Sequence, residues 1–339
     1  MSGPEPIAAI FGVEGTALTA SERAFFRDSN PAGFILFTRN CAEPTAVERL
    51  VTELRETVGR ADVPVLIDQE GGRVARLKPP HWPAYPAARE LAALGGTAAE
   101  EAVRLGARLI ADDLAALNIT VDCMPVLDLP VAGADPVIGD RAYGAMPALV
   151  AALGRAACDG LLEGGVLPVL KHIPGHGRAP LDSHLALPRV AAAADLLEAC
   201  DFAPFRALKD MPWAMTAHVL YESIDDSVPA TLSPRLISKT IRAGIGFNGV
   251  LVSDDLSMAA LPGGLGERTR RALMAGSDLV LHCNGNMGEM IEVAGAATPV
   301  TLAAGERLRR GEMRREAAFR PFDRARAEAR FVALTRQKE

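Results

Sequence analysis

Eight short apolar runs, separated by longer segments of helical pattern, limit the folds open to this chain of 339 residues. The runs cover residues 7–13, 33–37, 63–68, 119–128, 166–172, 213–219, 249–254 and 277–283. Because the runs are apolar on both faces, they are typical of parallel strands that helices cover on both sides. The alternation of strand and helix therefore predicts an α/β protein.

Polar or charged side chains recur at the C-terminal ends of these runs: Asp68, Asp128, His172, His218, Asp254 and His282. In a closed barrel those ends converge on one mouth, whereas an open sheet would spread them along a crevice. We therefore expect a single (β/α)8 barrel of the TIM type over residues 1–339. Two of the intervening helices are predicted to begin with capping boxes, formed by Thr19 with Glu22 and by Thr97 with Glu100.

Composition excludes several classes of protein. With 49% hydrophobic and 23% charged residues, the chain can bury a large core and is not disordered. Its formal net charge is −6, so no basic footprint covers the chain. Nine arginines lie between Arg307 and Arg330, but acidic residues are interleaved with them. This pattern indicates a solvated, ion-paired helix face, and we expect no binding of nucleic acid.

The cysteines and the N-terminal residues indicate the cellular compartment in which the protein is expected. Five widely spaced cysteines without a CxxC motif indicate buried thiols in a reducing environment. The first residues lack the basic start and long apolar run of a signal peptide, and no stretch of about 18 apolar residues could span a membrane. We expect a cytoplasmic monomer that binds neither membrane nor metal and needs no cofactor.

The stretch "KHIPGHGRAPLDSHLALP", residues 171–188, follows the fifth apolar run. Proline and glycine predict a sharp turn and a mobile loop after Lys171 and His172. Asp182 and His184 are two positions apart, so the carboxylate can hydrogen-bond the imidazole and orient it. The pair is a candidate general acid/base.

Acidic residues also end the third and seventh runs. In "LVSDDLSM" the adjacent Asp254 and Asp255 point to opposite faces, so at most one can aim into the mouth as a nucleophile, and both could instead cap the next helix. Asp68 is followed by a Gly-Gly pair and by Arg76, a combination that can hold sugar hydroxyls or a carboxylate. Arg141 lies in a glycine-bounded loop and is, on similarly weak grounds, a candidate to bind a sugar hydroxyl or a carboxylate.

Together, the motifs "IDQEGGRV", "KHIPGHG", "DSHLALP" and "LVSDDLSM" resemble those of glycoside hydrolase family 3, in particular its single-domain bacterial β-N-acetylhexosaminidases. The resemblance runs in order from about Ile7 to Cys283. It implies a (β/α)8 barrel that removes β-linked N-acetylglucosamine from cell-wall fragments with retention of configuration. The implied substrate is N-acetylglucosaminyl-anhydromuramic acid, with or without its peptide, in peptidoglycan recycling.

The resemblance also implies roles for individual residues. Asp254 is similar to the nucleophile of the family, with Asp255 in support, and His184 oriented by Asp182 is similar to its acid/base. The sugar-binding positions match Asp68, Arg76, Arg141, Lys171 and His172. His218 is a further candidate, with a supporting role behind the site.

The chain departs from the family pattern in the loop. Arg178 and Ala179 follow "GHG", where an acidic residue and a threonine are usual, and Ile173 stands where an aromatic residue is common. These changes concern the conformation and closure of the loop. Some relatives carry a second domain that supplies a glutamic acid, but after the eighth run this chain has only the residues from 284 onward, which leaves no room for such a domain.

Two other functions fit parts of the pattern. His172, His176 and His184 with Asp182 could form the metal site of a metal-dependent hydrolase, although their spacing fits no compact zinc motif and Lys171 would repel a cation. Full activity after chelation would dismiss this reading. A non-catalytic barrel that binds muropeptides is the other alternative, and turnover of an aryl N-acetylglucosaminide separates it from an enzyme.

Overall fold

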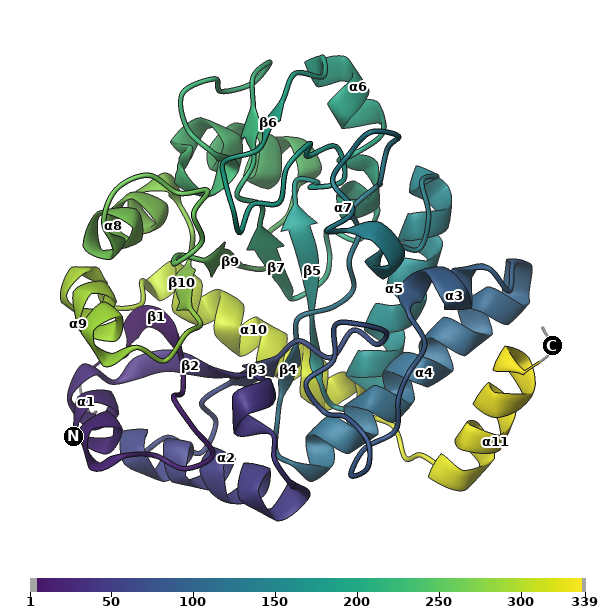
Figure 1. The fold of residues 1–339 in the computed structure, drawn as a ribbon, viewed down its shortest axis with the longest axis horizontal. Coiled ribbons are helices and arrows are strands. Elements are labelled where there is room, and N and C mark those ends of the chain that lie inside the picture. Colours follow the sequence, from purple (N-terminus) through teal and green to yellow (C-terminus); the bar gives the residue numbers. More distant parts are fainter. Residues whose placement is uncertain (1–4, 337–339) are drawn as a thin grey trace.

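In the computed structural model, residues 5–336 are described, and they form a closed barrel of eight parallel strands (Figure 1). The strands are β1 (Ile7–Gly12), β2 (Pro31–Leu36), β3 (Val65–Ile67), β4 (Val121–Asp122), β5 (Leu167–Ile173), β7 (Trp213–Thr216), β9 (Val250–Asp255) and β10 (Leu279–His282). Their order around the barrel is β1-β10-β9-β7-β5-β4-β3-β2. Each predicted run overlaps one barrel strand, which confirms the predicted fold.

Helices cover the outside of the barrel (Figure 1). The α-helices are α1 (Ala20–Ser29), α2 (Pro44–Val58), α3 (Ala88–Ala92), α4 (Gly96–Ala116), α5 (Pro147–Glu163), α6 (Ala194–Ala199), α7 (Ala203–Ala207), α8 (Leu265–Ala275), α9 (Met287–Ala296), α10 (Leu302–Ala318) and α11 (Arg324–Thr335). Short 3₁₀ segments are η1 (Thr38–Asn40), η2 (Gly139–Arg141) and η3 (Ala230–Leu232), and η4 (Leu236–Ile245) has π-helical hydrogen bonding. A small sheet, absent from the sequence-based expectations, pairs β6 (Arg189–Val190) with β8 (Leu220–Tyr221).

The barrel strands are buried on both faces, as their composition requires. β2, β3, β4, β5, β7 and β10 contain only buried residues. Helix α2 buries Val47, Leu50, Val51 and Leu54, which lie on one stripe at helical spacing. The fourth predicted run is mostly not strand, since β4 has two residues and the chain then continues irregularly to Asp128.

Of the two predicted capping boxes, the first is confirmed and the second is wrong. The Thr19 hydroxyl accepts a hydrogen bond from the Glu22 backbone N–H, and the Glu22 carboxylate accepts one from the Thr19 N–H. Helix α4 instead begins at Gly96, with Gly95 as N-cap and no side-chain cap bond. Gly95 and Gly96 both have positive φ angles, so a left-handed turn sets the start of α4 one position before Thr97.

The C-terminal helices tie the arginine-rich segment to the barrel. Helix α10 crosses the N-terminal ends of the strands, where a cavity of about 620 Å³ lies between α10 and the starts of β2, β5 and β7. Helix α11 packs against α4 at the edge of the molecule (Figure 1). The predicted ion pairing is confirmed, but most of the partners lie outside the segment. The pairs with residues outside the segment are Arg307–Asp278, Arg314–Asp210, Arg324–Asp112, Arg324–Asp113 and Arg330–Glu101, and the pairs within it are Arg315–Glu312 and Arg324–Glu328.

Within residues 5–336, no helix combines the length and apolar character needed to cross a bilayer. The five cysteines are free thiols. Cys41, Cys123 and Cys158 are buried, as predicted, whereas Cys200 and Cys283 are half-buried.

Candidate active site

A cavity of about 300 Å³ opens at the C-terminal ends of the barrel strands. Its lining includes every residue that the sequence nominates for catalysis or sugar binding: Asp68, Arg76, Arg141, Lys171, His172, Asp182, His184 and Asp254. Apolar side chains, among them Phe37, Met215 and Leu281, complete the wall. The structure therefore brings site residues from β5 and β9 and from the segments that follow β3, β4 and β5 to one small-molecule cavity.

A charged cluster forms one side of the cavity. Lys171 Nζ lies 2.8 Å from Asp68 Oδ1 and 2.7 Å from Glu70 Oε1. Arg76 donates to the second oxygen of Asp68 at 3.0 Å, and Arg141 donates to both oxygens of Glu70 at 2.7 and 2.8 Å. Three cations thus surround two carboxylates, an arrangement that holds fixed donors and acceptors for sugar hydroxyls.

These contacts set the charge states of the cluster. Burial raises the pKa of Glu70, but Arg141 and Lys171 outweigh it and bring the pKa to about 2. Lys171 and Arg76 likewise hold the pKa of Asp68 far below its ordinary value, against the effect of burial. Both groups are therefore carboxylates at neutral pH. Sequence reasoning missed Glu70, which does not line the cavity but fixes Arg141 and Lys171 through ion pairs.

Asp254 is the penultimate residue of β9, with its side chain in the cavity and its Oδ1 accepting from the Asp255 backbone N–H at 2.8 Å. His172 Nε2 lies 4.0 Å from Asp254 Oδ2. Burial raises the pKa of Asp254, but the imidazoles of His172 and His218 lower it by more, so the net pKa lies below the ordinary value of a carboxyl. Asp254 is thus an ionised carboxylate that faces the cavity.

Asp255 is engaged mainly in local structure. Its Oδ1 accepts from the backbone N–H groups of Ser257 and Cys283, and its Oδ2 accepts from the Ser257 hydroxyl. His218 is buried; its Nε2 donates to the Asp255 carbonyl at 3.0 Å, and its Nδ1 lies 2.7 Å from the Thr231 hydroxyl. Of the two adjacent acids, Asp254 therefore has the carboxylate with fewer fixed partners.

Asp182 and His184 meet on the loop after β5. His184 Nδ1 lies 2.7 Å from Asp182 Oδ1, which also accepts from the His184 backbone N–H at 2.9 Å. Burial raises the pKa of Asp182, but these bonds lower it below its ordinary value. The His184 side chain is 64% exposed, so its Nε2 is accessible from the cavity mouth.

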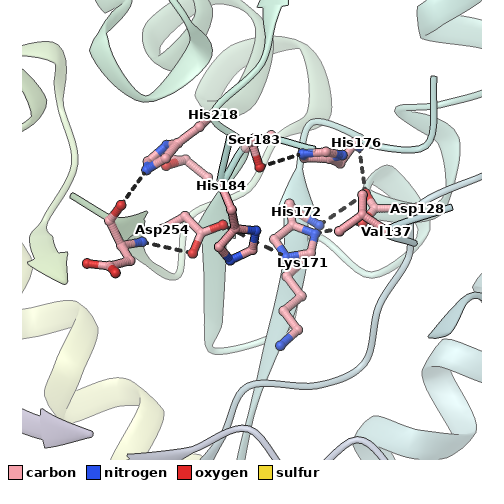
Figure 2. Close-up of polar contacts among 12 residues, drawn as sticks. Asp128, Val137, Lys171, His172, His176, Ser183, His184, His218 and Asp254 are labelled. Atoms are coloured by element: carbon pink, nitrogen blue, oxygen red, sulfur yellow. Dashed lines mark hydrogen bonds and ion pairs between the residues drawn. The ribbon is translucent and has the colours of Figure 1, made fainter. Parts of the chain in front are cut away.

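Asp128 is a second residue whose role sequence reasoning missed. It is fully buried, outside the cavity, and its carboxylate is close to three nitrogens: His172 N at 3.1 Å, His172 Nδ1 at 2.7 Å and His176 N at 2.6 Å. Figure 2 shows these contacts beside Lys171. Because Asp128 binds Nδ1 of His172, Nε2 of the same ring is left to face Asp254 and the cavity.

The prediction that all six strand-end side chains share the mouth is partly wrong. Asp128, His218 and His282 are buried and do not line the cavity. The His282 ring is held between two acids, with Nδ1 4.0 Å from Asp255 and Nε2 3.6 Å from Glu289. The strand end fixes the rim to which a side chain belongs, but it does not decide whether the side chain points into the cavity.

The imidazole rings of the three histidines in the metal alternative have separate hydrogen-bond partners. His172 contacts Asp128, His176 Nε2 contacts Ser183 Oγ at 3.1 Å, and His184 contacts Asp182. In the part of the chain that the structure describes, no three His, Cys, Asp or Glu side chains are grouped closely enough to hold a metal ion. The donor geometry therefore gives the metal-dependent reading no common centre.

Comparison with known proteins gives consistent results. Residues 7–306 match the family model of the glycosyl hydrolase family 3 N terminal domain. A β-hexosaminidase of Alkalilimnicola ehrlichii is 40% identical over 282 residues, which cover 81% of this chain and 80% of the relative.

Solved structures match over almost the full length. The crystal structure of NagZ from Neisseria gonorrhoeae in complex with N-trifluoroacetyl-D-glucosamine has a TM-score of 0.86 and 33% identity, and the match covers 98% of each chain. A structure of the same protein in complex with zinc ion has a TM-score of 0.85 and 32% identity, again over 98% of each chain.

Proposed function

This chain belongs to glycosyl hydrolase family 3 and is a glycoside hydrolase of the β-hexosaminidase type, and from that premise we propose its substrate and mechanism. The proposed substrate is N-acetylglucosamine in β-1,4 linkage to anhydro-N-acetylmuramic acid, with or without the attached peptide. The enzyme would act as an exo-hydrolase on such cell-wall fragments during peptidoglycan recycling. The N-acylated glucosamine bound by the Neisseria relative supports this class of sugar.

One observation carries the proposed mechanism: the Asp254 carboxylate and the His184 imidazole line the same cavity. In the first step, an Asp254 oxygen bonds to the anomeric carbon while the glycosidic C–O bond breaks. The protonated His184 gives its Nε2 proton to the departing oxygen. Because Asp182 binds Nδ1, the proton that moves is the one on Nε2.

In the second step, water releases the sugar from Asp254. The neutral imidazole of His184 takes a proton from the water, whose oxygen attacks the anomeric carbon and displaces the carboxylate. The configuration inverts twice and is therefore retained. An imidazole suits this role because its neutral form adds no second anion beside Asp254.

The charged cluster would bind the sugar in the proposed complex. Asp68, Arg76 and Lys171 line the cavity and present acceptors and donors that are already fixed by ion pairs, so little ordering is needed when hydroxyls bind. His172 is aimed by Asp128 toward the same space. We assign no step to a metal, and we propose a cytoplasmic monomer that binds neither nucleic acid nor membrane.

Parallel assays of an aryl β-N-acetylglucosaminide and an aryl β-glucoside test the proposal. The wild-type enzyme should hydrolyse the first substrate, and Asp254→Asn should lower kcat/KM by about 10³-fold or more, because the amide cannot form the covalent intermediate. The control Asp226→Asn, which changes an exposed carboxylate outside the cavity, should have the kcat/KM of the wild-type enzyme. The first sugar released should be the β-anomer by NMR.

Two outcomes would refute this proposal. Hydrolysis retained in Asp254→Asn would remove the nucleophile assignment, and release of the α-anomer first would replace the covalent route with direct attack by water.

A further inference from the structure

The loop that carries the Asp182–His184 pair divides into two parts. Residues 174–179, the loop root, are buried apart from the half-buried Arg178. Residues 180–186, the loop tip, are exposed except for the half-buried Asp182 and the buried Ser183. The proposed acid/base therefore sits on an accessible segment whose position depends on how the root is held.

Backbone contacts seat the root against neighbouring segments. The Tyr221 hydroxyl donates to the Gly175 carbonyl at 2.6 Å, and the Asp135 N–H donates to the Ala179 carbonyl at 2.9 Å. A Cβ added at Gly177 would lie 2.0 Å from the Leu129 carbonyl oxygen, so only glycine permits this approach. The root has little freedom to shift without losing these contacts.

One side-chain contact of the root belongs to a residue that departs from the family pattern. Arg178 Nε lies 2.7 Å from Asp201 Oδ2, with side chains 20% and 1% exposed. Asp201 lies directly beneath the root, since its Cβ is 3.1 Å from the position of a Cβ at Gly175. The other Asp201 oxygen, Oδ1, has no hydrogen-bond partner among the described residues. Arg178 therefore supplies the charge that balances a buried carboxylate at the base of the loop.

The root is connected to the tip through His176, two positions before Arg178. The His176 N–H donates to Asp128, and its Nε2 contacts the Ser183 hydroxyl at 3.1 Å. Ser183 lies between Asp182 and His184, and its carbonyl accepts from Ala260 N–H at 3.2 Å. A shift of the root would thus move the one buried residue of the tip and, with it, the residues on either side.

We propose that Arg178, paired with Asp201, is a positioning residue that holds the loop root so that the His184 imidazole reaches the leaving-group oxygen of the substrate. The proposal rests on the hydrolytic function above. Arg178 does not line the cavity, so it acts through the loop and not on the sugar.

Substrates whose leaving groups differ in their need for a proton can test whether Arg178 positions the acid/base His184. A phenyl β-N-acetylglucosaminide needs a proton for its phenol to depart, whereas a dinitrophenyl glycoside departs without one. For Arg178→Met, which keeps length and removes charge, kcat/KM should fall about tenfold with the phenyl substrate and less than about twofold with the dinitrophenyl substrate. Arg178→Lys should restore most of the loss, because it keeps a cation near Asp201.

The dinitrophenyl assay also controls for folding, because an unfolded fraction lowers both rates equally. Arg155→Met is the matched control, since it removes an arginine paired with Asp210 away from the cavity, and it should leave both rates unchanged. Equal losses with both substrates, or no loss with either, would overturn the proposal for Arg178. Absence of turnover by the wild-type enzyme would instead refute the proposed function itself.

Discussion

Asp128 aims two histidines with one carboxylate, and a single substitution can test this. In Asp128→Asn the amide nitrogen would face His172 Nδ1 as a donor and force the ring proton onto Nε2, toward Asp254. We predict that kcat/KM falls about 10- to 100-fold, the usual range for residues that orient an active-site ligand. Steady-state kinetics with an aryl N-acetylglucosaminide measures the effect.

The control for this variant is Asp112→Asn, which removes a half-exposed carboxylate paired with Arg324. It should leave kcat/KM unchanged. Unchanged kinetics in a folded Asp128→Asn enzyme would show that Asp128 only fills space.

The acid side of the pH dependence of the reaction follows from Asp254. Its pKa lies below the ordinary value because the imidazoles nearby favour the carboxylate over the effect of burial. Only the carboxylate can attack, so kcat/KM should hold as the pH falls to about 4 and decline below that value. A pH profile, with circular dichroism at each point to check the fold, tests this. A decline centred above about pH 5 would contradict it.

At the level of helices, α11 contributes stability without contributing to the site. Phe331 is 7% exposed and packs on Tyr85, with ring centroids 6.4 Å apart, while Gly106 of α4 lies directly beneath its ring. Phe331→Ala should therefore destabilise the protein by about 3 kcal/mol and leave kcat unchanged. Thermal or urea unfolding gives the first quantity and a standard assay the second.

Val332→Ala on the same helix is the matched control. Val332 is 37% exposed, so its truncation should change stability by less than about 0.5 kcal/mol. Equal effects of the two substitutions would mean that α11 is not docked as described.

The strands could be predicted more fully than the loops, for a physical reason. A strand buried on both faces leaves an apolar run in the sequence, so all eight barrel strands were recognisable. The short length of β4 was not predictable, because the apolar character continues to Leu127 although the chain leaves the sheet after Asp122.

The site residues at strand ends could likewise be predicted more fully than those held by contacts between loops. Asp68 follows β3, and His172 and Asp254 lie at the C-terminal ends of β5 and β9, so their rim was predictable from position. The Arg178–Asp201 pair and the contact of His176 with Ser183 join segments through folded loops, and no local spacing encodes them.

Across the entire protein, two similar carboxylates allow a comparison of buried and exposed charge. Asp278 bridges Arg242 and Arg307 with a side chain 5% exposed, and it also accepts from the Leu251 N–H. Asp278→Asn would leave two guanidinium groups without their anion, and we predict a loss of about 3 kcal/mol in the free energy of unfolding.

Asp210 is the exposed counterpart. It bridges Arg155 and Arg314 with a side chain 52% exposed, so Asp210→Asn should cost about 1 kcal/mol or less. Urea titrations of both variants test the contrast. Similar losses would indicate that the Asp278 network contributes no more than surface pairing.

The charged cluster of the cavity also joins the N-terminal and C-terminal halves of the chain through ion pairs. Asp68, Glu70, Arg76 and Arg141 precede the end of α5, whereas Lys171 follows it. A polypeptide cut between Gly164 and Gly165 would split every Lys171 ion pair and leave each fragment inert. After the two fragments are mixed, the rate at which an aryl glycoside is hydrolysed would then measure the fraction of molecules in which the barrel has formed again.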